Sequence, residues 1–329
     1  MKNINILDCT LRDGGYYNEW YFSEAFINDY LKFISLSGIE FVELGFSQFK
    51  KNKTKGYCYN VDNILINKLK IPQNLKIGLM INASDIIKNI DTSKAFKKFL
   101  LNKKKISLIR IACHFYEVNK IIPILKVLKK VKIKIAINLM QISEQKTIYI
   151  SKTLKKISKE KVDIFYFADS LGCMFPKQVK EIIHLIKKNS KAQIGFHAHD
   201  NSAKAKSNTL TAIANGSDWI DVTVLGMGRG AGNAKTEDFI KRNKLQFINK
   251  LKKKRFFNLK NKYKWGYNKY YHLSAKYKIH PTYIQQILKI SKITDKKIMN
   301  LIKGLKGKNS NYFNSKRLNT VLLENSIKI

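Results

Sequence analysis

Residues 195–201 of the chain are Gly195-Phe196-His197-Ala198-His199-Asp200-Asn201, and they close an apolar run that begins at Ala192. Side chains alternate along a β-strand, so a strand here places His197 and His199 on one face. Two imidazoles on one face suit a divalent metal ion, which needs a further ligand. Asp13, in Leu11-Arg12-Asp13-Gly14-Gly15, offers a carboxylate. The sequence therefore predicts that Asp13, His197 and His199 bind one metal at the mouth of a barrel.

Short β-rich runs recur along the chain outward from this stretch. There are eight: Ile4–Cys9, Ile39–Leu44, Lys76–Ile81, Ile106–Ala112, Lys132–Asn138, Asp163–Ala168, Ala192–His197 and Trp219–Val224. Segments with helical spacing lie between them, including Ser23–Ser37, Val118–Lys130, Ser143–Lys159 and Pro176–Asn189. Ser23 and Ser143 are expected N-caps, and Pro176 is expected in a first helical turn. This alternation predicts an α/β fold, a (β/α)8 TIM barrel, with a doubly wound open sheet as the alternative.

The strand–helix alternation stops near residue 240. Residues 241–329 carry 24 Lys and Arg residues against only Asp295 and Glu324, and they include the helical, aromatic segment Tyr267–Ile290. We therefore expect a TIM-barrel catalytic domain over residues 1–240. A basic helical C-terminal region over residues 241–329 should form a small helical appendix that packs near the barrel mouth. The chain from about Lys306 is expected to be loosely ordered.

The net charge of +40 allows two explanations. It is typical of a chain that meets an anionic polymer, but only six of the 63 basic residues are Arg, and the Lys residues are spread through every segment. Nucleic-acid readers rely on Arg for bidentate contacts, so general Lys usage is the favoured explanation and no specific nucleic-acid partner is expected. No run of 18 apolar residues predicts a membrane span. Four scattered cysteines and no signal-peptide layout predict a cytoplasmic protein.

The scarcity of Arg makes its positions informative. Before residue 240 only Arg12, Arg110 and Arg229 occur, each just after, or at the end of, a predicted strand. At these positions we expect the planar guanidinium group, with its several N–H donors, to be required. Active sites of such barrels lie at the C-terminal ends of the strands. Polar residues gather there: Asp8, Arg12 and Asp13; Glu43; Asn82; Arg110 and His114; Asn138 and Gln141; Asp169 and Ser170; Asp200 and Asn201; and Arg229 and Asn233.

Five motifs in order resemble the HMGL-like, or DRE-TIM metallolyase, superfamily, and most of all its 4-hydroxy-2-oxovalerate aldolase-like proteins. The motifs are Asp8-Cys9-Thr10-Leu11-Arg12-Asp13-Gly14, Arg110-Ile111-Ala112-Cys113-His114, Ala168-Asp169-Ser170-Leu171-Gly172, His197-Ala198-His199-Asp200-Asn201 and Gly226-Met227-Gly228-Arg229-Gly230-Ala231-Gly232-Asn233-Ala234. The chain departs from the family pattern in two places. Tyr16 stands where those aldolases have a histidine base, and Asp200-Asn201 follows the metal histidines as in the lyases and synthases.

The resemblance implies a divalent-metal-dependent aldolase that makes or cleaves a C–C bond in a 4-hydroxy-2-oxo acid, through a metal-stabilised enolate of the pyruvate type. Mn²⁺ is the first candidate, with Mg²⁺, Zn²⁺ or Co²⁺ as alternatives. A Claisen-type acyl-CoA synthase or lyase is a second hypothesis, favoured by Asp200. A non-catalytic basic barrel that binds anionic polymer is a third. The resemblance also implies an acylating aldehyde dehydrogenase partner and homo-oligomerisation.

The resemblance and the residue chemistry together suggest roles. Arg12 is expected to stabilise enolate charge, and Tyr16 to act as the base, with Tyr271, Tyr270 and His272 as further candidates from the C-terminal region. The candidate substrate-binding residues are Arg110, Ser170, Gly228 and Arg229. Arg110 has a second interpretation, as part of a polar layer inside the barrel. Asn233 is either a fourth metal ligand or a helix cap. Glu43 and Asp169 either orient a metal ligand or satisfy buried polar groups.

Overall fold

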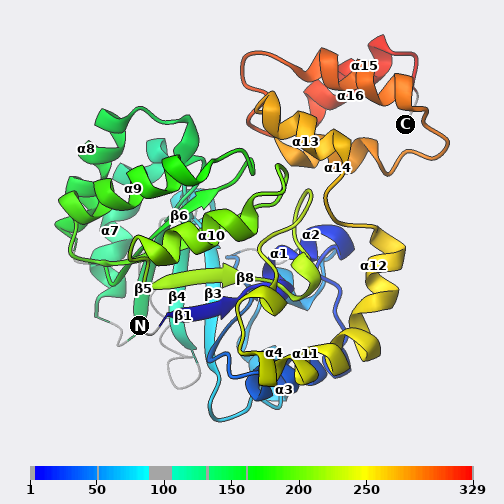
Figure 1. The fold of residues 1–329 in the computed structure, drawn as a ribbon. Helices are drawn as coiled ribbons and strands as arrows, with labels where there is room; N and C mark the ends of the chain where they lie inside the picture. The colour runs from blue at the N-terminus through cyan, green and yellow to red at the C-terminus, as the bar shows by residue number, and fades with distance from the viewer. Residues whose placement is uncertain (1–3, 50–51, 89–105, 131–132, 161, 328–329) are drawn as a thin grey trace.

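Eight parallel strands form a closed barrel in the computed structural model, which describes residues 4–49, 52–88, 106–130, 133–160 and 162–327 (Figure 1). The strands are β1 (Asn5–Asp8), β2 (Phe41–Phe46), β3 (Lys76–Asn82), β4 (Ile106–Cys113), β5 (Lys134–Leu139), β6 (Ile164–Asp169), β7 (Gln193–Ala198) and β8 (Trp219–Val222). β1 pairs with β8, with Asn5 opposite Trp219, so the sheet closes on itself. The (β/α)8 TIM barrel is confirmed, and the open-sheet alternative is wrong.

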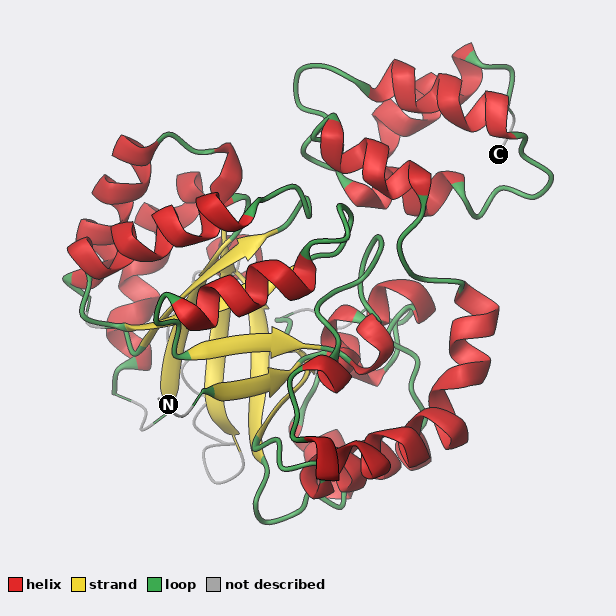
Figure 2. Ribbon diagram, in the orientation of Figure 1, coloured by secondary structure: helices red, strands yellow, loops and turns green. Residues whose placement is uncertain are grey.

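Helices cover the outside of the barrel, as the alternating sequence predicts (Figure 2). They are α3 (Glu24–Leu36), α4 (Asn63–Lys68), α5 (Ala83–Lys88), α7 (Val118–Leu128), α8 (Thr147–Ser158), α9 (Pro176–Asn189) and α10 (Ala205–Ala214). Ser23 is the N-cap of α3 and accepts a hydrogen bond from the Phe26 amide, and Pro176 begins α9. The Ser143 cap is wrong, because residues 142–144 form a separate 3₁₀ turn and Lys146 precedes α8.

The inside of the barrel has an apolar lower part. Inward side chains from six strands form a cluster separate from the strand–helix core: Leu7, Phe41, Leu108, Ala136, Ile164, Tyr166 and Trp219. Gly195 belongs to this level, because a Cβ at that position would lie 2.4 Å from the Tyr166 ring. Such filled layers are typical of TIM barrels, whose interior is a packed core. Ligand chemistry is therefore confined to the level above, toward the C-terminal ends of the strands.

The segment after the barrel continues the outer layer before it leaves it. Helix α11 (Leu245–Leu251) lies against α3, a π-helical turn spans Lys252–Phe256, and α12 (Phe257–Tyr263) follows. Phe256 packs on Phe26 with ring centroids 5.1 Å apart, and Arg255 pairs with Asp29. Ile248, Leu251, Phe256 and Trp265 share the core of the strand–helix layer. The domain division after residue 240 stays a prediction. The residues just named pack with the barrel.

The last four helices have a core of their own. They are α13 (Lys269–Lys276), α14 (Pro281–Ile287), α15 (Asp295–Leu305) and α16 (Ser315–Glu324), and Figure 1 shows them grouped apart from the barrel helices. The segment Tyr267–Ile290, predicted to be helical, contains two helices, because the chain turns before Pro281. The expectation of loose order after Lys306 is wrong for the described residues, which extend to Ile327. Leu318, Val321 and Leu322 of α16 are buried in this second core.

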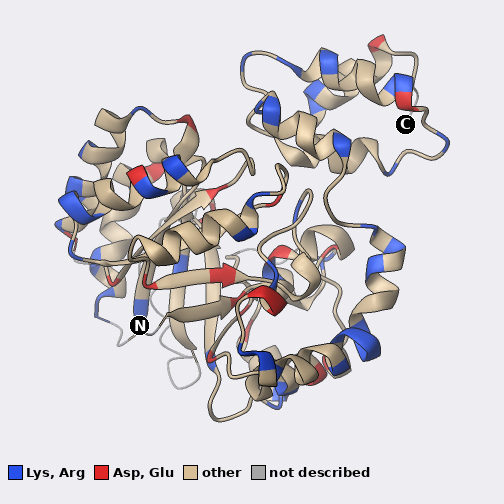
Figure 3. Cartoon of the chain, viewed as in Figure 1, with Lys and Arg blue, Asp and Glu red and all other residues tan. Residues whose placement is uncertain are grey.

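Lys and Arg residues are distributed over the outer helices and the C-terminal group alike (Figure 3). This distribution matches the general use of Lys that the composition indicates. Among the described residues, no helix combines the length and the apolar character that a membrane crossing requires.

Candidate metal centre

A polar layer sits directly above the apolar interior of the barrel. Inward side chains recur every second residue along a strand. Phe41 is followed by Glu43, Leu108 by Arg110, Gly195 by His197, and Trp219 by Asp221. All four polar side chains are buried. The strand period thus brings two carboxylates, one guanidinium and one imidazole together inside the barrel, just below its mouth.

Asp13, His197 and His199 converge at the mouth, as the sequence predicts. One ligand atom from each lies within 4.8 Å of the others, and all three residues are buried. His197 Nε2 lies 3.3 Å from His199 Nε2 and 3.7 Å from Asp13 Oδ2. Asp13 is the last residue of the short helix α1 (Thr10–Asp13), which follows β1 and precedes α2 (Gly15–Asn18). Two imidazole nitrogens and one carboxylate oxygen form a donor set that suits a divalent transition metal.

The protonation states of the group also fit a metal. Burial alone would raise the pKa of Asp13, but the Arg12 guanidinium and the two imidazoles lower that pKa below its ordinary value. Burial, together with the nearby positive charge, lowers the pKa of His199 well below its ordinary value. A carboxylate and a neutral imidazole are the forms that coordinate metal ions. A second grouping of Cys9, His197 and Asp221 fits less well, because burial raises the pKa of the Cys9 thiol.

Asp221 holds His197 from behind. Its Oδ2 lies 2.8 Å from His197 Nδ1, which leaves Nε2 directed at Asp13 and His199. Carboxylates commonly orient metal-binding histidines in this way. Sequence reasoning missed Asp221 and named Glu43 and Asp169 as candidates for this role. The available signal was an acidic residue inside the otherwise apolar strand segment Trp219–Val222.

Glu43 joins the two interior arginines. Arg12 Nε donates to Glu43 Oε2 at 2.7 Å, and Arg12 Nη1 donates to Asp13 Oδ1 at 2.6 Å. Arg110 lies between Glu43 and Asp221, at 3.3 and 2.6 Å, over the face of the Tyr166 ring. Arg110 has no exposed surface, so the geometry favours the polar layer over substrate binding. Arg12 Nη2 is buried with no hydrogen-bond partner.

The Gly-rich segment after β8 brings Asn233 to the metal group. Asn233 Nδ2 donates to Asp13 Oδ2, whereas its Oδ1 is buried without a partner. An unpaired buried oxygen beside the carboxylate is compatible with the predicted role as a fourth ligand. Gly228 lies against this amide, because a Cβ there would be 2.6 Å from Asn233 Oδ1. Gly228 therefore leaves room for the Asn233 side chain.

Arg229, Ser170 and Tyr16 lie together at the rim. Arg229 Nη2 donates to the Ser170 carbonyl at 3.2 Å, and its guanidinium lies 5.6 Å from the centre of the Tyr16 ring. The Ser170 hydroxyl accepts a hydrogen bond from the Gln141 amide. Burial raises the pKa of Tyr16, so its phenol is protonated at neutral pH and is poorly suited to act as a base.

The C-terminal helices reach the rim through Tyr271, which the sequence singled out, and through His280, which it did not. Tyr271 Oη lies 3.3 Å from Tyr17 Oη, and Tyr17 donates to the Gly230 carbonyl. Burial raises the pKa of Tyr271 to about 12. Tyr270 instead bonds to Asp295, and His272 is exposed next to Tyr267. The sequence analysis did not predict a role for His280, whose Nε2 lies 3.1 Å from Arg229 Nη1. The feature that could have indicated it is a polar residue directly before Pro281.

Asp169 and Asp200 have structural partners. Asp169 accepts hydrogen bonds from the backbone amides of Cys173 and Met174, which shapes the turn before α9. Asp200 accepts one from the Ala205 amide at the start of α10. The Asp200 carboxylate, which favoured the acyl-CoA hypothesis, is thus engaged at a helix start.

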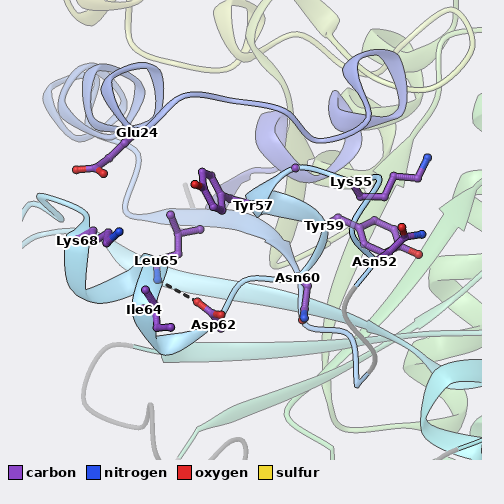
Figure 4. A pocket seen from close by; sticks show the side chains of 11 residues that line it. Glu24, Asn52, Lys55, Tyr57, Tyr59, Asn60, Asp62, Ile64, Leu65 and Lys68 are labelled. Carbon is purple, nitrogen blue, oxygen red and sulfur yellow. Dashed lines mark hydrogen bonds between the residues drawn. The ribbon is translucent and has the colours of Figure 1, made fainter.

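A separate pocket opens on the outer surface between α3, the segment after β2, and α4 (Figure 4). Glu24, Lys55, Tyr57, Asp62 and Lys68 are among its lining residues, and none of the metal-group residues lines it. Asp62 there caps α4 by accepting a hydrogen bond from the Leu65 amide. The pocket is independent of the centre described above.

The closed (β/α)8 barrel and the Asp–His–His group at its mouth place this chain in the class of TIM-barrel proteins with a candidate metal centre. The HMGL-like family model matches residues 3–261. The chain belongs to the HMGL-like family.

Relatives of known structure or description agree with this assignment. The crystal structure of the N-terminal domain of a proposed aldolase from Bacteroides vulgatus superposes with a TM-score of 0.76 and 30% sequence identity, covering 88% of this chain and 97% of that one. A 4-hydroxy-2-oxovalerate aldolase of Carboxydothermus hydrogenoformans is 27% identical over 72% of this chain and 69% of its own length. An oxaloacetate decarboxylase of Mycobacterium tuberculosis is 24% identical over 70% of this chain and 67% of its own. These relatives support an enzyme of the lyase kind.

Proposed function

We propose that this protein is a divalent-metal-dependent aldolase that cleaves or forms the C3–C4 bond of a 4-hydroxy-2-oxo acid. The observation that carries the proposal is the Asp13–His197–His199 group with the unpaired Nη2 of Arg12 beside it. The names of two relatives support the substrate class. Both 4-hydroxy-2-oxovalerate and oxaloacetate are 2-oxo acids, and breaking the C3–C4 bond of either leaves the enolate of pyruvate.

The metal would be held by Asp13, His197 and His199, with Asn233 as a fourth candidate. When bound, a divalent cation supplies Lewis-acid polarisation of the 2-oxo group. Mn²⁺ is our first candidate, and Mg²⁺, Zn²⁺ and Co²⁺ fit the same donors. Asp221 keeps the His197 ring in the orientation that presents Nε2.

Arg12 is positioned to stabilise the enolate. Two of its nitrogens are fixed by Glu43 and Asp13, so the guanidinium does not reorganise during the reaction. Its free Nη2–H is the donor for the oxygen on which negative charge develops. A preorganised donor of this kind contributes about 3 kcal/mol to transition-state stabilisation. In the cleavage direction, the C4 hydroxyl gives its proton to solvent water, the C3–C4 electron pair moves into the enolate, and the aldehyde departs.

Tyr16 is our candidate for proton delivery at the rim. Because burial raises the pKa of its phenol, Tyr16 holds its proton at neutral pH and acts as a donor. In the cleavage direction, it would give that proton to C3 of the enolate to form pyruvate and then regain a proton from solvent.

Hydrogen–deuterium exchange at the methyl group of pyruvate tests the proposal without knowledge of the aldehyde. Enolisation in D₂O replaces these hydrogens, and NMR measures the rate. We expect exchange with the metal-loaded protein, its loss after complete chelation, and its return on adding Mn²⁺. Asp13→Asn should remove exchange, whereas Asp238→Asn, at a surface pair with Lys206, should retain it. Exchange that persists without any metal would contradict the proposal.

A further inference from the structure

Arg229 differs from the other two arginines of the barrel in its partners. Arg12 and Arg110 each contact two carboxylates. Arg229 instead donates to neutral acceptors, the His280 imidazole at 3.1 Å and the Ser170 carbonyl at 3.2 Å. Across the described part of the chain, no carboxylate oxygen lies within ion-pair distance of it. Its positive charge is therefore uncompensated by a direct contact.

The surroundings of Arg229 make an uncompensated charge informative. The side chain is partly buried, its guanidinium lies over the Tyr16 ring, and its Nε is buried with no hydrogen-bond partner. A partly buried cation without a counter-ion carries a desolvation cost that no ion pair offsets, which makes it a candidate for a functional group. In a chain that otherwise uses Lys, a guanidinium at this place indicates recognition of a planar or tetrahedral oxyanion.

The C-terminal helices position this guanidinium. Pro281 packs directly on Gly230, where φ is +70° and a Cβ would lie 2.7 Å from the proline Cβ. Gln285 accepts from the Gly230 amide and donates to the Tyr16 carbonyl. These contacts bring His280 to Arg229. Because Nε2 accepts from the guanidinium, the imidazole is neutral and adds no competing charge.

We infer that Arg229, positioned by His280, binds a second anionic group of the substrate, distal to the 2-oxo acid end at the metal group. The inference rests on the proposed function and specifies its substrate class: a 2-oxo acid, or the aldehyde that joins it, with a carboxylate or phosphate at its far end. Arg229 directly follows Gly228, which lies against the Asn233 side chain, and Asn233 donates to Asp13 of the metal group. Arg229 therefore borders the site and leaves the metal donors free. The C-terminal helices complete the site through His280.

Matched ligands test this subsite by binding. Isothermal titration calorimetry on the Mn²⁺-loaded protein compares 2-oxoglutarate with 2-oxopentanoate, 2-oxoadipate with 2-oxohexanoate, and 3-phosphonopyruvate with 2-oxobutanoate. Each pair differs only in replacing a terminal methyl group with an anion. We expect at least one anionic ligand to bind about 10- to 100-fold more tightly than its neutral partner, as for hydrogen bonds to charged groups. The pair with the largest ratio of dissociation constants shows whether the subsite prefers a carboxylate or a phosphonate, which represents a phosphate.

Variants assign the preference to these residues. Arg229→Gln should reduce the ratio of dissociation constants to near one, whereas Arg242→Gln, at an exposed arginine, should retain it. His280→Ala should reduce the ratio, and His280→Gln should restore it, because the glutamine oxygen can replace Nε2 as an acceptor. The ratio is taken within each variant, so a loss of folded protein cancels. If His280 has a purely structural role, His280→Ala and His280→Gln should reduce the ratio equally. That result would overturn the positioning role.

Equal affinities for the neutral and anionic members of all three pairs in the wild-type protein would overturn the inference. Pyruvate exchange in the wild-type protein separates this failure from failure of the proposed function. Exchange without an anion preference contradicts the subsite only. An anion preference abolished by Arg229→Gln, without exchange, supports the subsite and contradicts the aldolase.

Discussion

Asp221 Oδ2 lies 2.8 Å from His197 Nδ1, so a carboxylate on β8 orients an imidazole on β7. The same oxygen accepts from Arg110 Nη2 at 2.6 Å. Arg110 in turn contacts Glu43, and Glu43 contacts Arg12. A continuous network of buried charges therefore runs beneath the metal group from His197 round to Asp13. Each charge in it is paired, which is the condition for keeping such groups in a barrel interior.

Asp221→Asn should weaken metal binding. The amide keeps the shape of the carboxylate but is a poorer acceptor for His197 and loses the charge that pairs with Arg110. We expect metal affinity to fall about 10- to 100-fold, as for other partners of metal-binding histidines. Competition with a fluorescent chelator measures it, and Asp163→Asn, at an exposed position, is the matched control. Unchanged affinity would show that Asp221 does not support a metal ligand.

Arg12→Lys should reduce turnover more than substrate binding. Lysine keeps one positive charge but cannot bond Glu43, Asp13 and a developing enolate oxygen together. Loss of this donor should cost about 3 kcal/mol in the barrier, or roughly 100-fold in kcat. Steady-state kinetics of pyruvate exchange give kcat and KM separately. Arg255→Lys, at the surface pair with Asp29, should behave as wild type. A change confined to KM would assign Arg12 to ground-state binding.

Tyr16→Phe tests the phenol as a proton donor. Its raised pKa keeps the hydroxyl protonated, so removing the hydroxyl removes a donor and no base. We expect kcat/KM for cleavage of a 4-hydroxy-2-oxo acid to fall about 10-fold or more. Tyr21→Phe, at an exposed tyrosine nearby in the chain, should have no effect. Activity within twofold of wild type would show that Tyr16 only packs against Arg229 and Trp20.

Asp169 should give the protein a characteristic pH dependence of stability. Burial raises its pKa to about 7, although backbone amides from Met174 and Cys173 oppose the shift. The unfolded side chain titrates near 3.9, so between about pH 4 and pH 7 the folded state binds more protons. The stability contributed by this proton is therefore present at low pH, falls as pH rises through that window, and is constant above it.

Urea unfolding of the wild type and Asp169→Asn, from pH 4 to pH 8 with a chelator present, isolates this contribution. The wild-type stability, taken relative to the variant, should fall with rising pH by up to about 1.4 kcal/mol per unit. The slope of the difference is the informative quantity, because the amide also changes the turn hydrogen bonds. Parallel curves over the whole range would mean that Asp169 titrates normally.

Much of this architecture is determined by the sequence itself. Apolar strand segments alternate with helical ones eight times, and burial of both faces of a parallel sheet requires that alternation, so the barrel follows. The metal group follows as well. His197 and His199 are paired by the strand period, and Asp13 follows β1, whose C-terminal end lies at the same mouth. The prediction failed where no such period operates, as at the Ser143 cap and in the segment after Lys306.

Only the tertiary structure decided which partners these side chains take. Asp221 meets His197 because neighbouring strands are in register, and Arg110 is enclosed because both carboxylates face it inside the barrel. His280 reaches Arg229 because the C-terminal helices pack against the Gly230 turn. Hydrogen bonds and ion pairs act over about 3 Å, and residues far apart along the chain come that close only once the barrel has closed and the C-terminal helices have docked.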